Sequence, residues 1–405
     1  MRYLLILGLG LCWFSANAQQ PSGVAQYFAT ARTDPGILAA RSKVEFLTGT
    51  DHRLPLVQEL EFRTETHDFL LEEQEYTLRF SPNTPALQRR QEAYHQAVVA
   101  LTEAQDRPLL LEALEPKYRT VVDYHFLPRL LESQRRTLEI YRQQLSLLRQ
   151  QVVTADFDLN DLVATETDIF ETEEELLDLQ QAWSVADEAI RAFRNDTLLT
   201  DLLKVEALGA IVRTTALPAP MEAEVLRLRR ELLRSDYERE LAAINNPLDF
   251  VQARYGGRNS DAFREEFSVG LGLRLPVKGD KKLDLLELEY EQEERHADFQ
   301  LEQLEREKEI AEAARAVRFG IERYELLRQQ NTDSQTEFAL RQLEQLSDSD
   351  PLQILRLRLL LHRRQQRLLE LRYRLYRDYV DWLVLTETMV ALPLRNWLSE
   401  ELSVF

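Results

Sequence analysis

The side chains best suited to catalysis or metal binding are scattered along this sequence. No HxxxH or HExxH spacing occurs among the six histidines, which are His52, His67, His95, His125, His296 and His362. The Gly270-Leu-Gly272 segment lies inside an alternating strand pattern and does not precede a helix, so it is not a phosphate-binding loop. The 69 Asp and Glu residues are spread over helical sequence without an obvious acid–base pair. We therefore expect no enzymatic activity, no metal site and no cofactor.

The single cysteine, Cys12, lies in an N-terminal segment with the features of a secretory signal. Arg2 precedes an apolar run from Tyr3 to Phe14, and the small residues Ala16 and Ala18 follow. The run is too short to span a membrane as a helix. We predict a signal peptide over residues 1–18, whose removal leaves no cysteine and hence no disulfide.

Composition indicates extended helices more than a thick globular core. Of the 405 residues, 29% are charged and only 12 are glycine, which is typical of long helices with charged flanks. The net charge of -19 argues against a nucleic-acid partner, because a phosphate backbone attracts cationic proteins. The acidity favours either simple solubility or a lumen that attracts cations.

Four short segments have the period of β-strands. In the clearest of them, Phe267, Val269, Leu271, Leu273 and Leu275 alternate with Ser268, Gly270, Gly272 and Arg274. We predict strands at about 56–66, 74–80, 248–255 and 267–275. No other segment has about 18 uninterrupted apolar residues, so we expect that entry into a membrane would require a β-barrel.

The mature sequence contains two similar halves. LPLVQELEF, which begins at Leu54, and NPLDFVQARY, which begins at Asn246, share a Pro-Leu pair at an offset of 192 residues. The same offset relates two interruptions of the long helical sequence, whose shared aspartates are Asp156, Asp158, Asp348 and Asp350. We predict a first repeat over 19–217, a second over 218–390 and a tail over 391–405.

Each repeat is expected to contain a helix, a β-hairpin and a long helical hairpin. The first helices are predicted at Val24–Leu47 and Pro220–Ala243. Because two-stranded hairpins are marginal in water and sheet edges are a liability, closure by several chains is one solution. A small soluble sheet that caps the helices is the other. The helices similarly suit either a ring of packed helices or an ordinary antiparallel coiled coil.

In the order of its motifs the chain resembles the TolC-like outer-membrane efflux and secretion channels. DPGILAARSKVEFL, from Asp34 to Leu47, corresponds to the family pattern NPxLxAAxxxVExA, and VGLGLRLPVKG, from Val269 to Gly279, corresponds to VGLxLxLPLF. The interruptions that begin at Leu148 and Leu340 correspond to the family's mid-helix motif, RYxxGxxxxxDVLxAxxxL. The resemblance covers nearly all of the mature chain, and the order of elements that it rests on occurs in both halves.

The resemblance implies a mainly α fold with a small β part. Three protomers would form an α-barrel in the periplasm and close a 12-stranded β-barrel in the outer membrane. It also implies the passive conduit of a tripartite efflux or type I secretion system, with a periplasmic adaptor (membrane fusion protein) and an inner-membrane pump as partners. Outer-membrane lipid would contact the side chains Phe267, Val269, Leu271, Leu273 and Leu275. The four aspartates would mark an equatorial mid-helix motif.

The resemblance also implies a periplasmic tip where the helical hairpins turn. By position, these turns are expected near Tyr118–Leu130 and Ala313–Tyr324. The residues nominated for the tip and gate are Asp123, Tyr124, Arg315, Glu322 and Arg323.

Three features depart from the family pattern. Pro108, Pro116 and Pro128 are expected to kink or break the first long helix, because proline removes a backbone donor. The glycine of the mid-helix motif is absent, and the first strand pair is rich in charges. Phe405 follows what reads as a helical tail. A soluble periplasmic coiled-coil adaptor or scaffold therefore stays as the alternative to an outer-membrane channel.

Overall fold

The computed structural model describes residues 23–50, 53–66, 74–151, 158–193, 202–218, 220–256, 267–273, 281–332, 335–346, 350–400 and 402–405. The predicted signal peptide and Cys12 lie outside these residues, as do His52 and His67. The same holds for Asp156, Asp348, Arg274 and Leu275.

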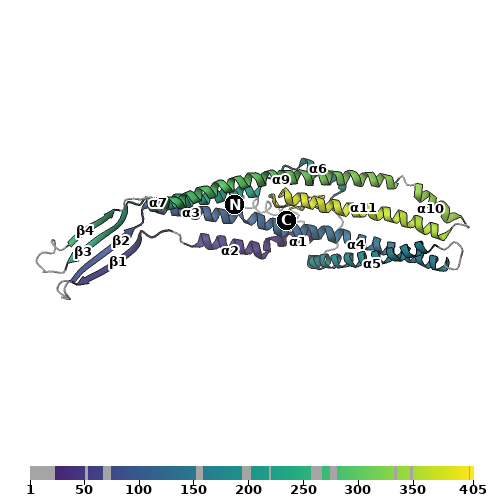
Figure 1. The fold of residues 1–405 in the computed structure, drawn as a ribbon, viewed down its shortest axis with the longest axis horizontal. Helices are drawn as coiled ribbons and strands as arrows, with labels where there is room; N and C mark the ends of the chain where they lie inside the picture. Colours follow the sequence, from purple (N-terminus) through teal and green to yellow (C-terminus); the bar gives the residue numbers. More distant parts are fainter. Residues whose placement is uncertain are drawn as a thin grey trace, which may run out of the picture. The chain divides into compact units, whose positions relative to one another are not determined.

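The same order of elements occurs twice along the chain (Figure 1). The first half consists of α1 (Gly23–Ala29), the 3-10 helix η1 (Thr30–Thr33), α2 (Pro35–Gly49), β1 (Val57–Thr66), β2 (Gln74–Pro82), α3 (Pro85–Ala104), α4 (Asp106–Gln151), α5 (Leu159–Ile190), η3 (Arg191–Phe193) and α6 (Val205–Thr214). The second half consists of α7 (Met221–Ile244), β3 (Leu248–Gly256), β4 (Phe267–Leu273), α9 (Lys281–Thr332), α10 (Gln335–Gln345), α11 (Pro351–Leu385) and η4 (Thr388–Val390). All four strands lie close to their predicted positions.

The chain forms two compact units, which are described separately. The strand unit comprises Pro35–Pro108 and Ala219–Glu305. It holds the four strands together with α2, α3, α7 and the first part of α9. The helical unit comprises the remaining segments, Met1–Asp34, Leu109–Pro218 and Arg306–Phe405.

In the strand unit, the sheet has the order β1-β2-β3-β4 and every neighbouring pair is antiparallel. The segment of α3 and the first turn of α4 runs antiparallel to α7, since Arg90 of α3 pairs with Glu238 and Arg107 of α4 lies 3.7 Å from Glu224. Asn83 closes the base of the first hairpin, where its side-chain amide donates to the carbonyl of Pro55 at 2.7 Å.

The core of the helical unit is built around the fully buried Tyr118 of α4. Its ring stacks on Phe28 of α1 with centroids 4.2 Å apart, and its hydroxyl donates to the carbonyl of Arg395 at 2.8 Å. Phe405 also contacts this core, with its ring 5.5 Å from that of Phe28. The prediction of a helical tail is wrong, because the described residues after η4 are not helical.

Helix α9 approaches α11 closely at Gly320. A Cβ at this position would lie 2.9 Å from Cδ1 of Leu375, so a larger residue would require the Leu375 side chain to shift. Both Val317 and Leu375 are buried at this contact. The close approach fixes where α9 lies against α11.

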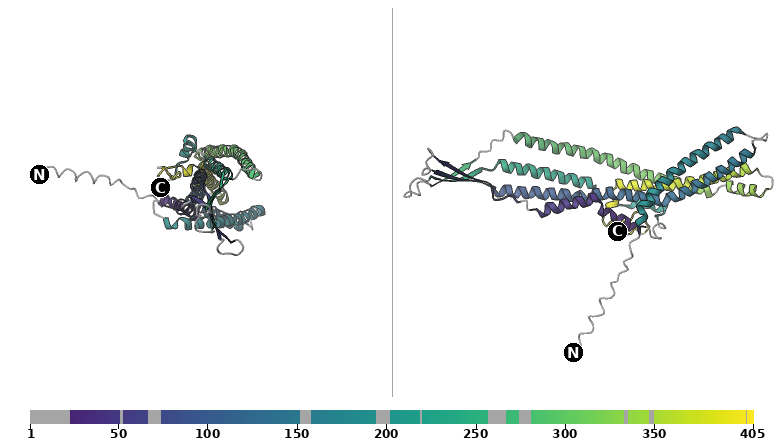
Figure 2. Two further views of the ribbon diagram at one scale, coloured as in Figure 1. Left: turned by 90° about the vertical axis from the view of Figure 1, so that its left-hand side faces the viewer. Right: turned by 90° about the horizontal axis from the view of Figure 1, so that it is seen from below.

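The helical hairpins turn elsewhere than predicted. Helices α4 and α5 lie side by side and run antiparallel, since Arg142 pairs with Glu173 at 2.7 Å and Arg149 with Glu166 at 3.1 Å (Figure 2). The first turn therefore lies between Gln151 and Asp158, and the expected turns at Tyr118–Leu130 and Ala313–Tyr324 are wrong because both segments are helix interiors.

Two of the four aspartates assigned to an equatorial mid-helix motif, Asp158 and Asp350, lie within the described residues and begin helices. Asp158 caps α5, and its carboxylate accepts from the backbone N–H of Asn160 at 2.8 Å. At the same offset of 192, Asp350 caps α11 by accepting from Leu352 at 2.9 Å. These two residues begin the returning helices, because a carboxylate satisfies otherwise unpaired N–H groups of a first helical turn.

The prolines affect α4 less than expected. Pro116 and Pro128 lie within the continuous helix α4. The interruption is at Gln105, between α3 and α4, and Pro108 lies in the first turn of α4, where its missing N–H costs little. The first predicted helix is instead divided near Asp34 and Pro35 into α1, η1 and α2.

No helix in the described part of the chain combines the length and apolar character needed to span a membrane.

The Tyr118 hydroxyl can be tested by a Tyr118→Phe substitution. It accepts from Trp397 N–H at 3.3 Å as well as donating to Arg395, so its loss leaves two polar groups without this partner. We expect the free energy of unfolding, measured by chemical denaturation, to fall by about 1–3 kcal/mol. Tyr290→Phe, at a side chain that is 69% exposed, is the control and should change stability little. Equal effects of the two substitutions would contradict this role.

Candidate functional site: a two-faced sheet and a charged helix seam

The register of the four strands gives the sheet one continuous apolar face. Directly paired residues lie on the same face, and one row across the strands reads Phe62, Leu78, Ala253 and Val269. The rows on either side add Leu60, Phe80, Val251, Leu271, Tyr76, Tyr255 and Phe267. Only Thr64 interrupts this face among these paired positions.

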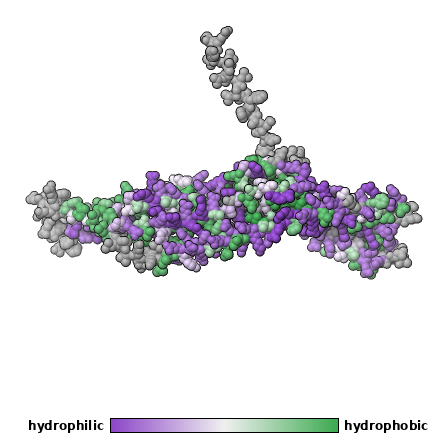
Figure 3. All heavy atoms as spheres, turned by 90° about the horizontal axis from the view of Figure 1, so that it is seen from above, coloured by the Kyte–Doolittle hydropathy of each residue, from purple (hydrophilic) through white to green (hydrophobic). Residues whose placement is uncertain are grey.

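This apolar face is exposed in the single chain. Leu60 is 67% exposed, Phe62 64% and Leu271 67%. Hydrophobic residues gather over the strands at the left of the space-filling view (Figure 3). A contiguous apolar patch of this kind marks a surface that meets lipid or another protein.

The opposite face of the same sheet is charged. Glu61 pairs with Arg63 at 2.7 Å on β1, and Glu75 of β2 pairs with Arg254 of β3. Further along this face, the Arg79 guanidinium lies 3.7 Å from the ring centroid of Phe250. The charges that appeared unfavourable in the first strand pair thus all lie on one side.

Phe250 explains one of the glycines on β4. It is paired with Gly272, and a Cβ at Gly272 would collide with the Phe250 ring. The ring lies across the strand where no side chain blocks it. A side chain at position 272 would therefore have to displace the Phe250 ring from this place.

The two outer strands leave the sheet open. Strands β1 and β4 each have one neighbour in the sheet, so one edge of each carries backbone groups without a strand partner among the described residues. These edges are 10 and 7 residues long. Such edges are templates for pairing with another chain.

The predicted lipid-facing residues are brought together by this sheet. Phe267, Val269 and Leu271 lie on the apolar face, and Leu273 at the end of β4 is 73% exposed. Leu275 lies outside the described residues. Contact of these side chains with lipid stays a prediction.

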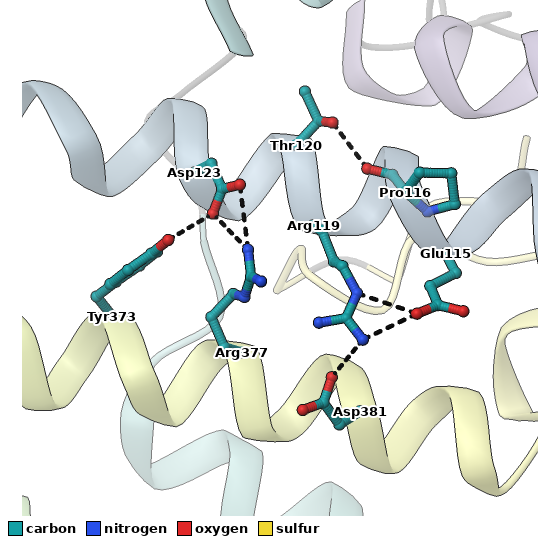
Figure 4. A network of polar contacts seen from close by, with 8 residues as sticks. All are labelled: Glu115, Pro116, Arg119, Thr120, Asp123, Tyr373, Arg377 and Asp381. Atoms are coloured by element: carbon teal, nitrogen blue, oxygen red, sulfur yellow. Dashed lines mark hydrogen bonds and ion pairs between the residues drawn. The ribbon is translucent and has the colours of Figure 1, made fainter. Parts of the chain in front are cut away.

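A second arrangement of charges joins α4 and α11 in the helical unit (Figure 4). Arg377 donates to both carboxylate oxygens of Asp123, at 2.9 and 3.1 Å, and the Tyr373 hydroxyl donates to the same carboxylate at 2.8 Å. One helical turn away, Arg119 lies 2.8 Å from Asp381. The seam runs antiparallel, because the residue number falls on α4 as it rises on α11.

The seam continues along both helices as a buried polar layer. Gln366 of α11 donates to Gln134 at 2.7 Å and accepts from Thr137 at 3.1 Å. The Gln134 amide in turn donates to Glu175 of α5 at 2.5 Å. Buried polar pairs are satisfied in only one alignment, so this layer fixes the register of the three helices.

Burial and the contact with Asp123 keep Tyr373 neutral. Burial is the larger cause and the hydrogen bond to the Asp123 carboxylate the next, and together they raise the pKa of Tyr373 to about 12. Burial also raises the pKa of Tyr376 and Tyr379 on the same helix. These hydroxyls act as hydrogen-bond donors and are poor proton acceptors at neutral pH.

The residues nominated for the tip do not form one cluster. Asp123 belongs to the seam, and Tyr124 is buried in the core. Arg315, Glu322 and Arg323 lie on exposed positions of α9, where Arg315 is 3.9 Å from Glu312. Their placement at a hairpin turn is wrong, whereas a role in gating stays a prediction. The partners Tyr373 and Arg377 had escaped notice, although both lie on the inner face of a clear helical pattern.

The described residues contain no group of three or more His, Cys, Asp or Glu side chains arranged to hold a metal ion.

The Asp123 contacts can be tested by Asp123→Asn. The substitution removes the charge that Arg377 and Tyr373 approach, so we expect thermal denaturation to show a loss of about 1–3 kcal/mol. The matched control is Glu132→Gln in the exposed pair with Arg136 on the same helix, which should cost less than about 1 kcal/mol. A loss at Asp123 no larger than in the control would contradict a structural seam.

The sequence and the fold were each compared with those of known proteins. No protein-family model matches the sequence, and no curated protein matches it. The outer membrane protein VceC of Vibrio cholerae superimposes with a TM-score of 0.63 at 15% identity, over 90% of this chain and 95% of that chain. The open state of the Neisseria gonorrhoeae MtrE outer membrane channel gives a TM-score of 0.61 at 13% identity, over 90% and 88%.

A third structure, CusC, whose structures are described in terms of transmembrane channel formation, gives a TM-score of 0.62 at 13% identity, over 90% of this chain and 92% of that chain. At these identities the likeness concerns the fold. The predicted fold class is confirmed: the chain has the fold of the TolC-like outer-membrane channels.

Proposed function

We propose that this chain is the outer-membrane channel component of a tripartite efflux or type I secretion system. In this proposal it is a passive, non-enzymatic conduit without a cofactor, exported by the signal peptide over residues 1–18. The observation that carries the proposal is the sheet with one exposed apolar face, one charged face and two open edges. In a soluble periplasmic adaptor or scaffold, so large an apolar face would be exposed to water, which is unfavourable.

The faces of the sheet support a definite orientation. The apolar face, with Phe267, Val269 and Leu271, would contact outer-membrane lipid. The face with Glu61, Arg63 and the other paired charges would line an aqueous lumen, because alternating side chains of a membrane strand face lipid and water in turn. Four strands from each of three copies would close a barrel of 12 strands, which leaves no edge unpaired.

The helix α5 supports association with further copies. Its exposed apolar residues recur at intervals of 4, 7, 7 and 8 residues: Leu159, Val163, Phe170, Leu177 and Val185. The helix carries ten acidic residues and no Lys or Arg over Leu159–Ile190. A stripe of this spacing suits knobs-into-holes packing against another helix, and we propose that a neighbouring copy supplies it.

The adaptor and the inner-membrane pump are proposed as the further partners, from the fold alone. Periplasmic placement of the helical unit would leave the hairpin turns, near residues 151–158 and 346–350, available to them. Drugs, metals and polypeptides are all compatible substrate classes, since selectivity in such an assembly would reside in the pump.

The orientation of the sheet can be tested with two adjacent residues on opposite faces. Val251 pairs with Phe80 and Leu271 on the apolar face, whereas Gln252 pairs with Arg79 and Gly270 on the charged face. Val251→Lys would place a charge in lipid at a cost of about 2–4 kcal/mol near the bilayer midplane, so we expect a reduced membrane fraction. Gln252→Lys is the matched control and should fractionate as the unsubstituted protein does. Recovery of the unsubstituted protein in the soluble periplasm without detergent would reject the channel.

Closure between copies can be tested by engineered disulfides. Within one chain β1 and β4 are separated by three strand spacings, about 14 Å, which is too far for a disulfide. We expect Phe62→Cys, combined in turn with a cysteine at Phe267, Val269, Leu271 or Leu273, to give covalent trimers on oxidation in at least one register. The matched series at Ser268, Gly270 and Gly272 places the second thiol on the other face and should not cross-link. Monomers in every combination would contradict closure by β1 and β4.

A further inference from the structure

The strand unit contains a cavity that the proposed channel function does not use. It lies between α3, α7 and the first part of α9 and has a volume of about 390 Å³. This volume is within the range of small-molecule sites, which is about 300–1,000 Å³. All of its lining residues belong to the strand unit.

The interior of the cavity is apolar. Leucines of α3 and α7 supply it: Leu101, Leu226, Leu232 and Leu233. Each of these side chains is only partly buried in the structure, so apolar surface remains accessible inside the cavity. Covering this surface with an aliphatic chain would remove it from water, which is favourable in proportion to the area covered.

The rim of the cavity is cationic. Arg229 and Arg230 of α7 and Arg295 of α9 line it, and none of them forms an ion pair with another described residue. Other arginines on α3 and α7 are paired, as Arg90 is with Glu238. Three guanidinium groups against the one carboxylate of Glu291 give the lining a net positive charge in a chain whose net charge is -19.

His296 of α9 also lines the cavity, next to Arg295. Its Nε2 lies 3.1 Å from the side-chain nitrogen of Gln300. Its Nδ1 is buried and has no hydrogen-bond partner among the described residues. Because solvent does not reach this nitrogen, it is not one of the groups that would contact a ligand in the cavity.

We propose that this cavity binds a single-chain amphipathic anion, that is, an aliphatic chain with a carboxylate or phosphate head. The leucines take the chain, while Arg229, Arg230 and Arg295 take the head. Arginine suits this role because its planar guanidinium group matches carboxylate and phosphate oxygens in pairs. The site is a binding site on the wall of the strand unit and takes no part in chemistry.

The test uses the full chain in phosphatidylcholine nanodiscs, with empty nanodiscs as the blank for partition into lipid. Isothermal titration with decanoate should give saturable binding of one molecule per chain. Decan-1-ol, which lacks the charge, should bind at least tenfold more weakly. Hexanoate should also bind at least tenfold more weakly, since each buried CH₂ contributes about fourfold in affinity.

Substitutions distinguish the cavity from the rest of the surface. The triple variant Arg229→Gln, Arg230→Gln and Arg295→Gln should lower the affinity for decanoate to that for decan-1-ol. Arg227→Gln, on α7 but outside the lining, is the matched control and should bind decanoate unchanged. These arginines are exposed, so the variants should fold.

Three results would overturn the proposal. One is the absence of saturable decanoate binding, and another is binding by the triple variant equal to that of the unsubstituted chain. The third is a change in the number of chains per particle in the triple variant, which would assign the arginines to a contact between copies. None of these results bears on whether the sheet closes, so failure here leaves the channel proposal separately testable.

Discussion

The constraint on which this structure depends is that one chain cannot satisfy its own sheet. Four strands expose a continuous apolar face, from Leu60 on β1 to Leu271 on β4, and leave the outer edges of β1 and β4 without a partner. Exposure of the apolar face to water is unfavourable, and each open edge can pair with any available strand. In the proposed channel, lipid would cover the apolar face, and strands of neighbouring copies would pair with the two edges. Both unfavourable terms would then be removed. The apolar stripe of α5 requires the same kind of partner.

The core of the helical unit is, by contrast, held together by contacts within one chain. Tyr118 stacks on Phe28 and bonds the tail, Asp123 is held by Arg377 and Tyr373, and Gln134, Thr137 and Gln366 fix the register of α4 and α11. Apolar contacts between leucine-rich helices alone would allow the helices to slide along one another. These polar contacts are satisfied in one register only. In the channel that we propose, each copy would need helices of fixed register. The seam sets that register within one chain.

The sequence predicted some levels of this structure well and others poorly, for physical reasons. Strands were located because a period of two bounded by glycine and proline is a local signal, and Phe267 to Leu273 carries it clearly. Hairpin turns were misplaced because they were assigned by position in the repeat, whereas both expected segments are helix interiors. The direction of α5 against α4 is seen only in ion pairs between the two helices, such as Arg142 with Glu173. Asp158 and Asp350 were noticed as a repeated pair, yet their role as helix caps depends on where the chain reverses. The partners of Asp123 lie about 250 residues away, and no local pattern identifies them.

The central claim is that three copies complete one structure. Native mass spectrometry of the full chain, released from detergent micelles, measures the number of chains per complex directly. Our account predicts a complex of three chains that requires detergent to stay in solution. A monodisperse single chain that is stable in buffer without detergent would contradict it.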